Sequence, residues 1–182
     1  MYRRVKIRNI MNITKIIALF LLLPLQVRAD SIPLGNIDVR LEVTAHPRIE
    51  VEKPQGGWYS SIKLESSPEN HLLYQKELPV TVKLRRQEGF RISVKNPLIL
   101  TRHSTARAGA DQAFSPAQVR WGTDHANLRV LSTIPEAFNV AQGKTRQTNT
   151  DYILHISALA PSGPNSAGKY HGQLTLIFET NS

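Results

Sequence analysis

Apolar and polar positions alternate along this chain in short runs, which is the pattern of half-buried β-strands. The clearest run covers residues 37–45, and its apolar positions are Ile37, Val39, Leu41, Val43 and Ala45. Further alternating runs cover residues 48–51, 58–66, 78–86, 90–100, 117–121, 128–132, 151–160 and 168–181. Eight or nine strands of this length predict an all-β protein, an immunoglobulin-like β-sandwich.

Turn residues separate these runs. The sequence "PQGGW" at residues 54–58 predicts a turn, and the Gly, Ser and Pro residues of 161–168 predict a loop. The segment "PEAFNVA" at residues 135–141 is the one candidate for a helical turn between strands. No repeat of fixed period is present, so we expect one domain.

The first residues have the pattern of an export signal. Five basic residues and no acid precede the apolar run "IIALFLLLPLQV", which is followed by "VRA". The apolar run is shorter than the roughly 20 residues that span a bilayer. We therefore expect residues 1–29 to be a secretory signal peptide, cut after Ala29.

The basic charge of the chain belongs largely to this segment. Removing residues 1–29 takes six of the 23 Lys and Arg and none of the 14 Asp and Glu, so the formal charge falls from +9 to +3. The remaining 153 of the 182 residues suffice for one domain with a core. A charge this small argues against nucleic acid as a partner.

Residue types that could act in catalysis or bind a metal ion are scattered along the sequence. The six histidines form no pair with metal-ligand spacing, although His155 and His171 fall in neighbouring predicted strands that could approach each other. The chain has no cysteine, no G-x-S-x-G motif and no glycine-rich phosphate loop. We therefore expect neither an enzyme nor a metal or cofactor site, and stability must come from packing, backbone pairing or a partner chain.

Three segments, in order, resemble the alpha class of chaperone-usher fimbrial subunits, the CFA/I-type pilins. They are "NIDVRLEVTAHPRIEV" (36–51), "SPAQVRWGTDHANLRVLSTIPEAF" (115–138) and "YILHISALAPSGPNSAGKYHGQLTLIFETNS" (152–182). The first is similar to the family's N-terminal donor strand, and the last to its closing strand. The segment "DSIPLG" (30–35) has no counterpart in the family, and residues 75–112 match loosely.

The resemblance implies an incomplete sandwich with residues 30–46 as a donor-strand extension and residues 47–182 as the pilin domain. The donor strand would insert its apolar side chains into a neighbouring subunit: Ile37, Val39, Leu41, Val43 and Ala45. The closing strand would border the acceptor groove and pair with a periplasmic chaperone through Tyr170, Gly172, Leu174, Leu176 and Phe178.

The partners that the resemblance implies are further copies of the chain in a head-to-tail homopolymer, a periplasmic chaperone, an outer-membrane usher and a tip adhesin. Contact with a host-cell receptor would be indirect, and the protein would reach the bacterial surface through the periplasm as part of a fimbrium. Two alternatives stay open. One is a minor or initiating fimbrial subunit, and the other is a stand-alone periplasmic β-sandwich that binds carbohydrate, in which residues 37–45 are simply the first strand.

Overall fold

The computed structural model describes residues 35–43, 48–86, 88–102, 113–140, 147–162 and 166–180. All of them belong to the unit Ser31–Ser182. The strands in these residues are β1 (Asn36–Val43), β2 (Ile49–Glu52), β3 (Ser61–Lys63), β4 (Glu65–Ser66), β5 (Leu73–Arg85), β6 (Gly89–Val94), β7 (Thr101–Arg102), β8 (Gln118–Gly122), β9 (Arg129–Val130), β10 (Glu136–Asn139), β11 (Gln147–Leu159) and β12 (Tyr170–Thr180). One 3-10 turn, η1 (His125–Asn127), is capped by Asp124, whose carboxylate accepts hydrogen bonds from the amides of Ala126 and Asn127.

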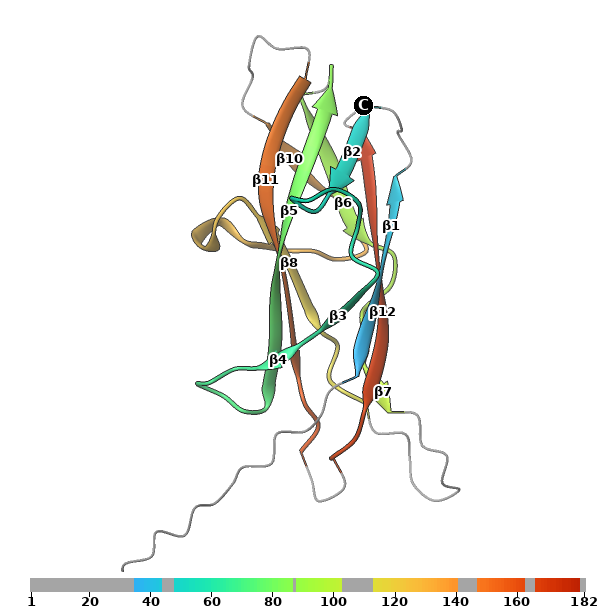
Figure 1. Cartoon of the computed structure of the whole chain (residues 1–182), viewed down its shortest axis with the longest axis vertical. Helices are drawn as coiled ribbons and strands as arrows, with labels where there is room; N and C mark the ends of the chain where they lie inside the picture. The colour runs from blue at the N-terminus through green and yellow to red at the C-terminus, as the bar shows by residue number, and fades with distance from the viewer. Residues whose placement is uncertain are drawn as a thin grey trace, which may run out of the picture. The chain divides into compact units, whose positions relative to one another are not determined.

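The strands form two sheets that face each other across a hydrophobic core (Figure 1). The first sheet has the order β10-β6-β12-β1-β3, with β7 paired to the lower part of β12. The second has the order β2-β5-β11-β8-β9, with β4 paired to β5. The predicted all-β, immunoglobulin-like sandwich is confirmed, and the described residues contain no helix long and apolar enough to cross a membrane.

The longest ladder, between β5 and β11, organises the second sheet. The two strands pair over 13 residues, from Leu73 opposite Leu159 to Arg85 opposite Gln147. Alternate side chains of both strands, such as Val80 and Leu154, face the first sheet and are fully buried. This is the period-two pattern that the sequence showed.

Aromatic rings fill the centre of the core. Phe90 of β6 is fully buried and contacts four other rings, with centroid separations of 5.5 to 6.4 Å. Those rings belong to Trp121, Phe138, Tyr152 and Phe178. They come from β8, β10, β11 and β12, so this cluster joins the two sheets.

The helical turn expected at residues 135–141 is absent, and this prediction was wrong. Residues Glu136–Asn139 form β10, which pairs antiparallel with β6 at the edge of the first sheet. Phe138 pairs with Phe90, and their rings stack at 5.8 Å. Burial of Phe138 in the aromatic cluster outweighs the weak local preference for a turn.

The chain changes sheets three times near its start. It runs from β1 in the first sheet to β2 in the second, returns as β3, and passes to the second again as β4. Between β2 and β3, Gly56 and Gly57 adopt φ angles of 81° and 73°, which suit glycine. Half-buried Trp58 and Tyr59 then pack against the core, and Tyr59 donates a hydrogen bond to the carbonyl of Pro79 (2.8 Å).

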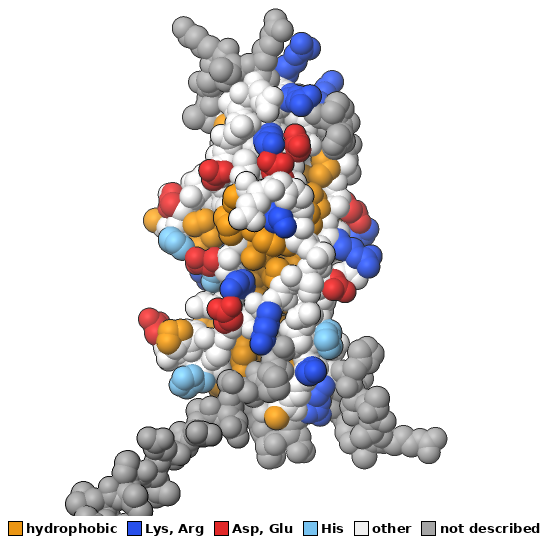
Figure 2. All heavy atoms as spheres, viewed as in Figure 1, with side chains coloured by type: hydrophobic (Ala, Val, Ile, Leu, Met, Phe, Trp, Pro, Cys, Tyr) orange, Lys and Arg blue, Asp and Glu red, His pale blue; other side chains and the backbone are white. Residues whose placement is uncertain are grey.

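The surface is mixed in character. On the face seen in Figure 2, hydrophobic side chains lie along the middle, with charged side chains around them.

Candidate functional site: the groove that holds the N-terminal strand

The strand β1 lies inside the first sheet, between β12 and β3. We call this place, bounded by β12 and β3, the strand groove. β1 runs parallel to β12, with Val39 opposite Leu174 and Val43 opposite Phe178. It runs antiparallel to β3, with Ile37 opposite Ile62. The first strand of the chain therefore fills a groove in its own sandwich.

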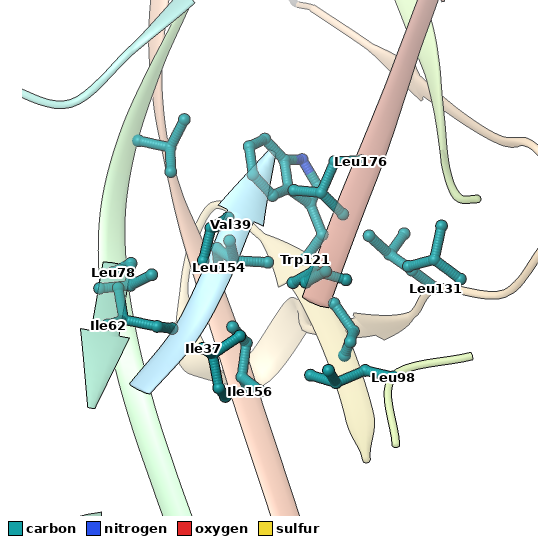
Figure 3. Packing of buried hydrophobic residues seen from close by; sticks show 14 of the residues in the cluster. Ile37, Val39, Ile62, Leu78, Leu98, Trp121, Leu131, Leu154, Ile156 and Leu176 are labelled. Atoms are coloured by element: carbon teal, nitrogen blue, oxygen red, sulfur yellow. The ribbon is translucent and has the colours of Figure 1, made fainter. Parts of the chain in front are cut away.

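The inner face of β1 is apolar, as the sequence predicted, and burial decreases toward its end. Ile37 is 0% exposed and Val39 3%, and both point toward Leu154 and Ile156 of the second sheet (Figure 3). Leu41 and Val43 are partly buried and pack against the same core. Ala45, the last predicted donor residue, lies outside the described residues.

The predicted closing-strand residues form the other wall of the groove. Leu174, Leu176 and Phe178 of β12 are fully buried and face the core beside β1. Tyr170 is also fully buried, packs edge-on against Phe114 at 4.8 Å, and donates a hydrogen bond to the carbonyl of Ser166 (2.8 Å). Gly172 lies opposite Ile37.

Gly172, one of the predicted closing-strand residues, is a tight position. A Cβ added there would lie 2.6 Å from Leu100 and 2.9 Å from Leu98. Both leucines are fully buried and belong to the segment after β6. Leu98, Leu100 and Ile62 of β3 were therefore missed as parts of the groove. Their apolar character was visible in the sequence, but nothing local indicated which strand they would meet.

The two edges of β1 are held unequally. Its ladder with β12 covers all residues from Ile37 to Val43, whereas the ladder with β3 ends at Asp38 opposite Ser61. One further hydrogen bond, from the amide of Val39 to the carbonyl of Ser60, measures 3.3 Å. β1 is therefore paired with β12 from Ile37 to Val43, whereas its pairing with β3 is confined to its first residues.

The outer face of β1 carries alternating charges: Asp38, Arg40 and Glu42. Glu42 forms an ion pair with Lys95, at 2.7 Å between carboxylate and ammonium. The backbone amide of Lys95 donates to the carbonyl of Thr175 on β12 (2.9 Å), so its position is fixed by the groove wall. A polar hollow of about 270 Å³ lies here, lined in part by Arg40, Glu42 and Lys95.

Gly35 closes the start of the groove. A Cβ at this position would collide with the backbone carbonyl oxygen of Tyr170 and lie 2.8 Å from the His171 ring. Only glycine allows the chain to pass so close to the start of β12.

A second hollow, of about 580 Å³, opens near the β9 and β10 edge of the sandwich. Phe138 and Tyr152 line it, together with polar residues such as Asn127. The guanidinium of Arg129 lies 5.2 Å above the ring of Phe138 and pairs with Glu136 at 2.9 Å. Burial raises the pKa of Tyr152 to about 12, which keeps its phenol neutral.

His155 and His171, which lie in neighbouring predicted strands, do not come together in the structure. His155 lies on β11 in the second sheet and His171 on β12 in the first. Their strand neighbours Leu154 and Tyr170 face the core, so the two histidines point to opposite outer faces. Burial lowers the pKa of His155, and its Nε2 lies 3.4 Å from the side-chain oxygen of Gln75. Within the described residues, no group of three or more His, Asp or Glu side chains could hold a metal ion.

Comparisons with known proteins give similarity to solved structures only at low identity. No protein-family model and no curated protein matches the chain. Among solved structures, the chain is similar to the CooA pilin subunit from enterotoxigenic Escherichia coli. The identity is 13%, the match covers 75% of this chain and 99% of that one, and the TM-score is 0.44.

Proposed function

We propose that the protein is a structural subunit of a fimbrium and that it polymerises by giving β1 to a neighbouring copy. The observation that supports the proposal is that β1 fills a groove whose walls come from distant parts of the chain. β1 lies next to the start of the described chain, and only residues 44–47 separate it from the rest of the domain. The groove that it fills is built from β3, β12 and the segment around Leu98. The same strand of another copy would fill it equally well.

Burial of apolar side chains supplies the driving force. Ile37 and Val39 are almost completely buried, and each contributes roughly 1.5–3 kcal/mol. Together they contribute about 3–6 kcal/mol, with smaller terms from the half-buried Leu41 and Val43. An empty groove would expose Leu174, Leu176 and Phe178 together with unpaired backbone groups of β12, which favours aggregation.

These properties explain the partners that the sequence resemblance implies. A periplasmic chaperone would hold the groove by lending a strand beside β12, and at an outer-membrane usher the β1 of the next subunit would replace it. This is strand addition, in which backbone bonds give affinity and alternate side chains give specificity. Head-to-tail contacts of this kind do not close, so they form a filament. The export signal, the surface location and the tip adhesin belong to the same proposal.

One observation favours a second candidate. β1 already fills the groove of its own chain, as it would in a stand-alone periplasmic β-sandwich. Such a protein would need no neighbour to be complete.

Deletion of residues 30–43 separates the two candidates. If the chain is a fimbrial subunit, the full-length protein forms filaments and SDS-resistant multimers, and the deletion variant forms neither but still binds a strand-donating chaperone. Full-length Arg40→Ala is the matched control, because this side chain also lies on the exposed outer face of β1, and it should retain assembly. A full-length chain that stays monomeric, with a deletion variant that folds equally well alone, would establish the stand-alone sandwich.

A further inference from the structure

The hollow of about 580 Å³ near β9 and β10, which we call the edge hollow, is lined by both sheets. Gly122, Arg129 and Tyr152 lie on β8, β9 and β11 of the second sheet, and Ala137–Asn139 lie on β10 of the first. The turn η1 and Leu128 complete the wall. None of the described residues that line it belongs to β1, β3 or β12, so the edge hollow is separate from the strand groove. Its volume lies in the range of about 300–1,000 Å³ that small-molecule sites occupy.

The wall formed by η1 is fixed by its own hydrogen bonds. A Cβ at Gly122 would lie 2.5 Å from the carbonyl oxygen of Asn127, so glycine lets η1 fold back onto the end of β8. The carboxylate oxygens of Asp124 accept from the side-chain nitrogen of Asn127 at 2.9 and 2.8 Å. The side-chain oxygen of Asn127 accepts no hydrogen bond within the described part of the chain. A wall that is ordered in advance lowers the entropy cost of binding a ligand.

Tyr152 brings a hydroxyl without a partner to the edge hollow. Its ring packs against Trp121 at 5.0 Å and Phe90 at 5.5 Å, and the residue is only 4% exposed. The hydroxyl forms no hydrogen bond to a described residue, and burial alone raises its pKa to about 12. Tyrosine hydroxyls that are buried to this extent usually have a hydrogen-bond partner. Because Tyr152 lines the edge hollow, a ligand there would supply that partner.

Arg129 lines the edge hollow with its charge already balanced. Its Nη1 lies 2.9 Å from the carboxylate of Glu136 and 3.5 Å from the carbonyl of Ala137, and the guanidinium covers the ring of Phe138. Nε and Nη2 donate to no group in the described residues and remain as donors. An anionic ligand would meet the carboxylate of Glu136 here, and a cationic ligand would meet the guanidinium. The ion pair therefore favours a neutral ligand.

The mixture of donors, acceptors and apolar groups indicates the class of this ligand. A sugar hydroxyl both donates and accepts hydrogen bonds, and the apolar side chains of Leu128 and Ala137 suit the C–H groups of a sugar ring. A lipid chain would leave the polar groups of the lining unpaired. We propose that the edge hollow binds a neutral sugar unit, with the Tyr152 hydroxyl, the Asn127 side-chain oxygen and the Arg129 guanidinium as its hydrogen-bond partners. The site lies within one chain, so it does not depend on strand donation.

Saturation-transfer difference NMR tests the binding, because it detects a bound sugar on a monomer and on a filament alike. The probes are N-acetylglucosamine and galactose. One sugar unit in an open site predicts a dissociation constant in the millimolar range, and at least one of the two sugars should show saturable binding. The absence of saturable binding by both sugars at concentrations up to about 50 mM would overturn the proposal.

Substitutions locate the binding in the edge hollow. Tyr152→Phe removes a hydroxyl that has no partner in the fold, so it should keep the urea midpoint at neutral pH and bind the sugar roughly 2- to 12-fold more weakly. Ala126→Trp, at an exposed position of the lining, fills the hollow and should abolish binding. Tyr59→Phe is the matched control, because its hydroxyl contacts Pro79 outside the hollow, and it should bind as wild type does. Equal affinities of wild type, Tyr152→Phe and Ala126→Trp would overturn the site.

Further probes test the class and the source of the ligand. Tighter binding of N-acetylneuraminic acid or of tri-alanine than of both neutral sugars would overturn the neutral class, in favour of an acidic sugar or of a peptide that pairs with β10. Chitotetraose and lactose carry N-acetylglucosamine and galactose at the end of a longer chain. If they bind at least as tightly as the single sugars, the ligand is the end of a glycan, and if only the single sugars bind, it is a free sugar. Both of these results support the site.

Discussion

Replacing Ile37 with alanine tests whether β1 is part of the core of the isolated monomer. Ile37 is fully buried and lies between Gly172 on β12 and Ile62 on β3. Gly172 has no side chain that could move into the space left behind. Removal of three carbon groups costs about 2.4 kcal/mol in transfer free energy, at about 0.8 kcal/mol each. An uncollapsed cavity raises the cost to about 3–4 kcal/mol.

The assay is thermal unfolding of the monomer, followed by circular dichroism at a concentration where light scattering shows one chain. A domain of this size loses about 2–4 °C of Tm per kcal/mol, so Ile37→Ala should lower Tm by about 6–16 °C. Ile37→Val should cost about 1 kcal/mol. Asp38→Ala, the neighbour on the outer face, should stay within about 0.5 kcal/mol of wild type. Equal Tm values for Ile37→Ala and Asp38→Ala would refute the placement of β1 in its own groove.

Three further predictions concern the groove and the core. Leu176→Asp places a carboxylate opposite Leu41 in the fully buried wall of the groove and should abolish both folding and capture by a chaperone; surface filaments from this variant would contradict the role of β12. Gly35→Ala should lower the stability of the closed monomer by about 1–3 kcal/mol, because the new Cβ meets the carbonyl of Tyr170; an unchanged urea midpoint would contradict the close approach. Because the folded-state pKa of Tyr152 is raised to about 12, its stabilisation is complete below pH 10 and decreases as the pH rises from 10 to 12; Tyr152→Phe should lose less stability over this range in urea unfolding, and parallel curves would contradict it.

Much of the fold follows from period-two patterning. Val80, Val82 and Leu84 on β5, and Leu174, Leu176 and Phe178 on β12, are buried as their alternation predicted. The pattern identifies the buried face of each strand, because a shift of one residue in register would turn every apolar side chain of that face to solvent. The inner face of β1 was predicted for the same reason.

The sequence does not indicate which strands become neighbours in a sheet. Alternation in β1 is the same whether the strand fills its own groove or that of another chain. The parallel ladder with β12 and the contacts of Gly172 with Leu98 and Leu100 join segments far apart in the chain. Similarly, Phe138 became part of a strand because the distant Phe90 offered a stacking partner, which no local rule for "PEAFNVA" contains.

The central claim is that β1 of one chain fills the groove of the next. Solid-state NMR on filaments from equal amounts of two chain populations, one labelled with ¹³C and the other with ¹⁵N, tests it directly. Strand donation predicts contacts between the backbones of β1 and β12 that join the two populations. Contacts found only within each population would show that every chain keeps its own first strand, and would contradict the proposed function.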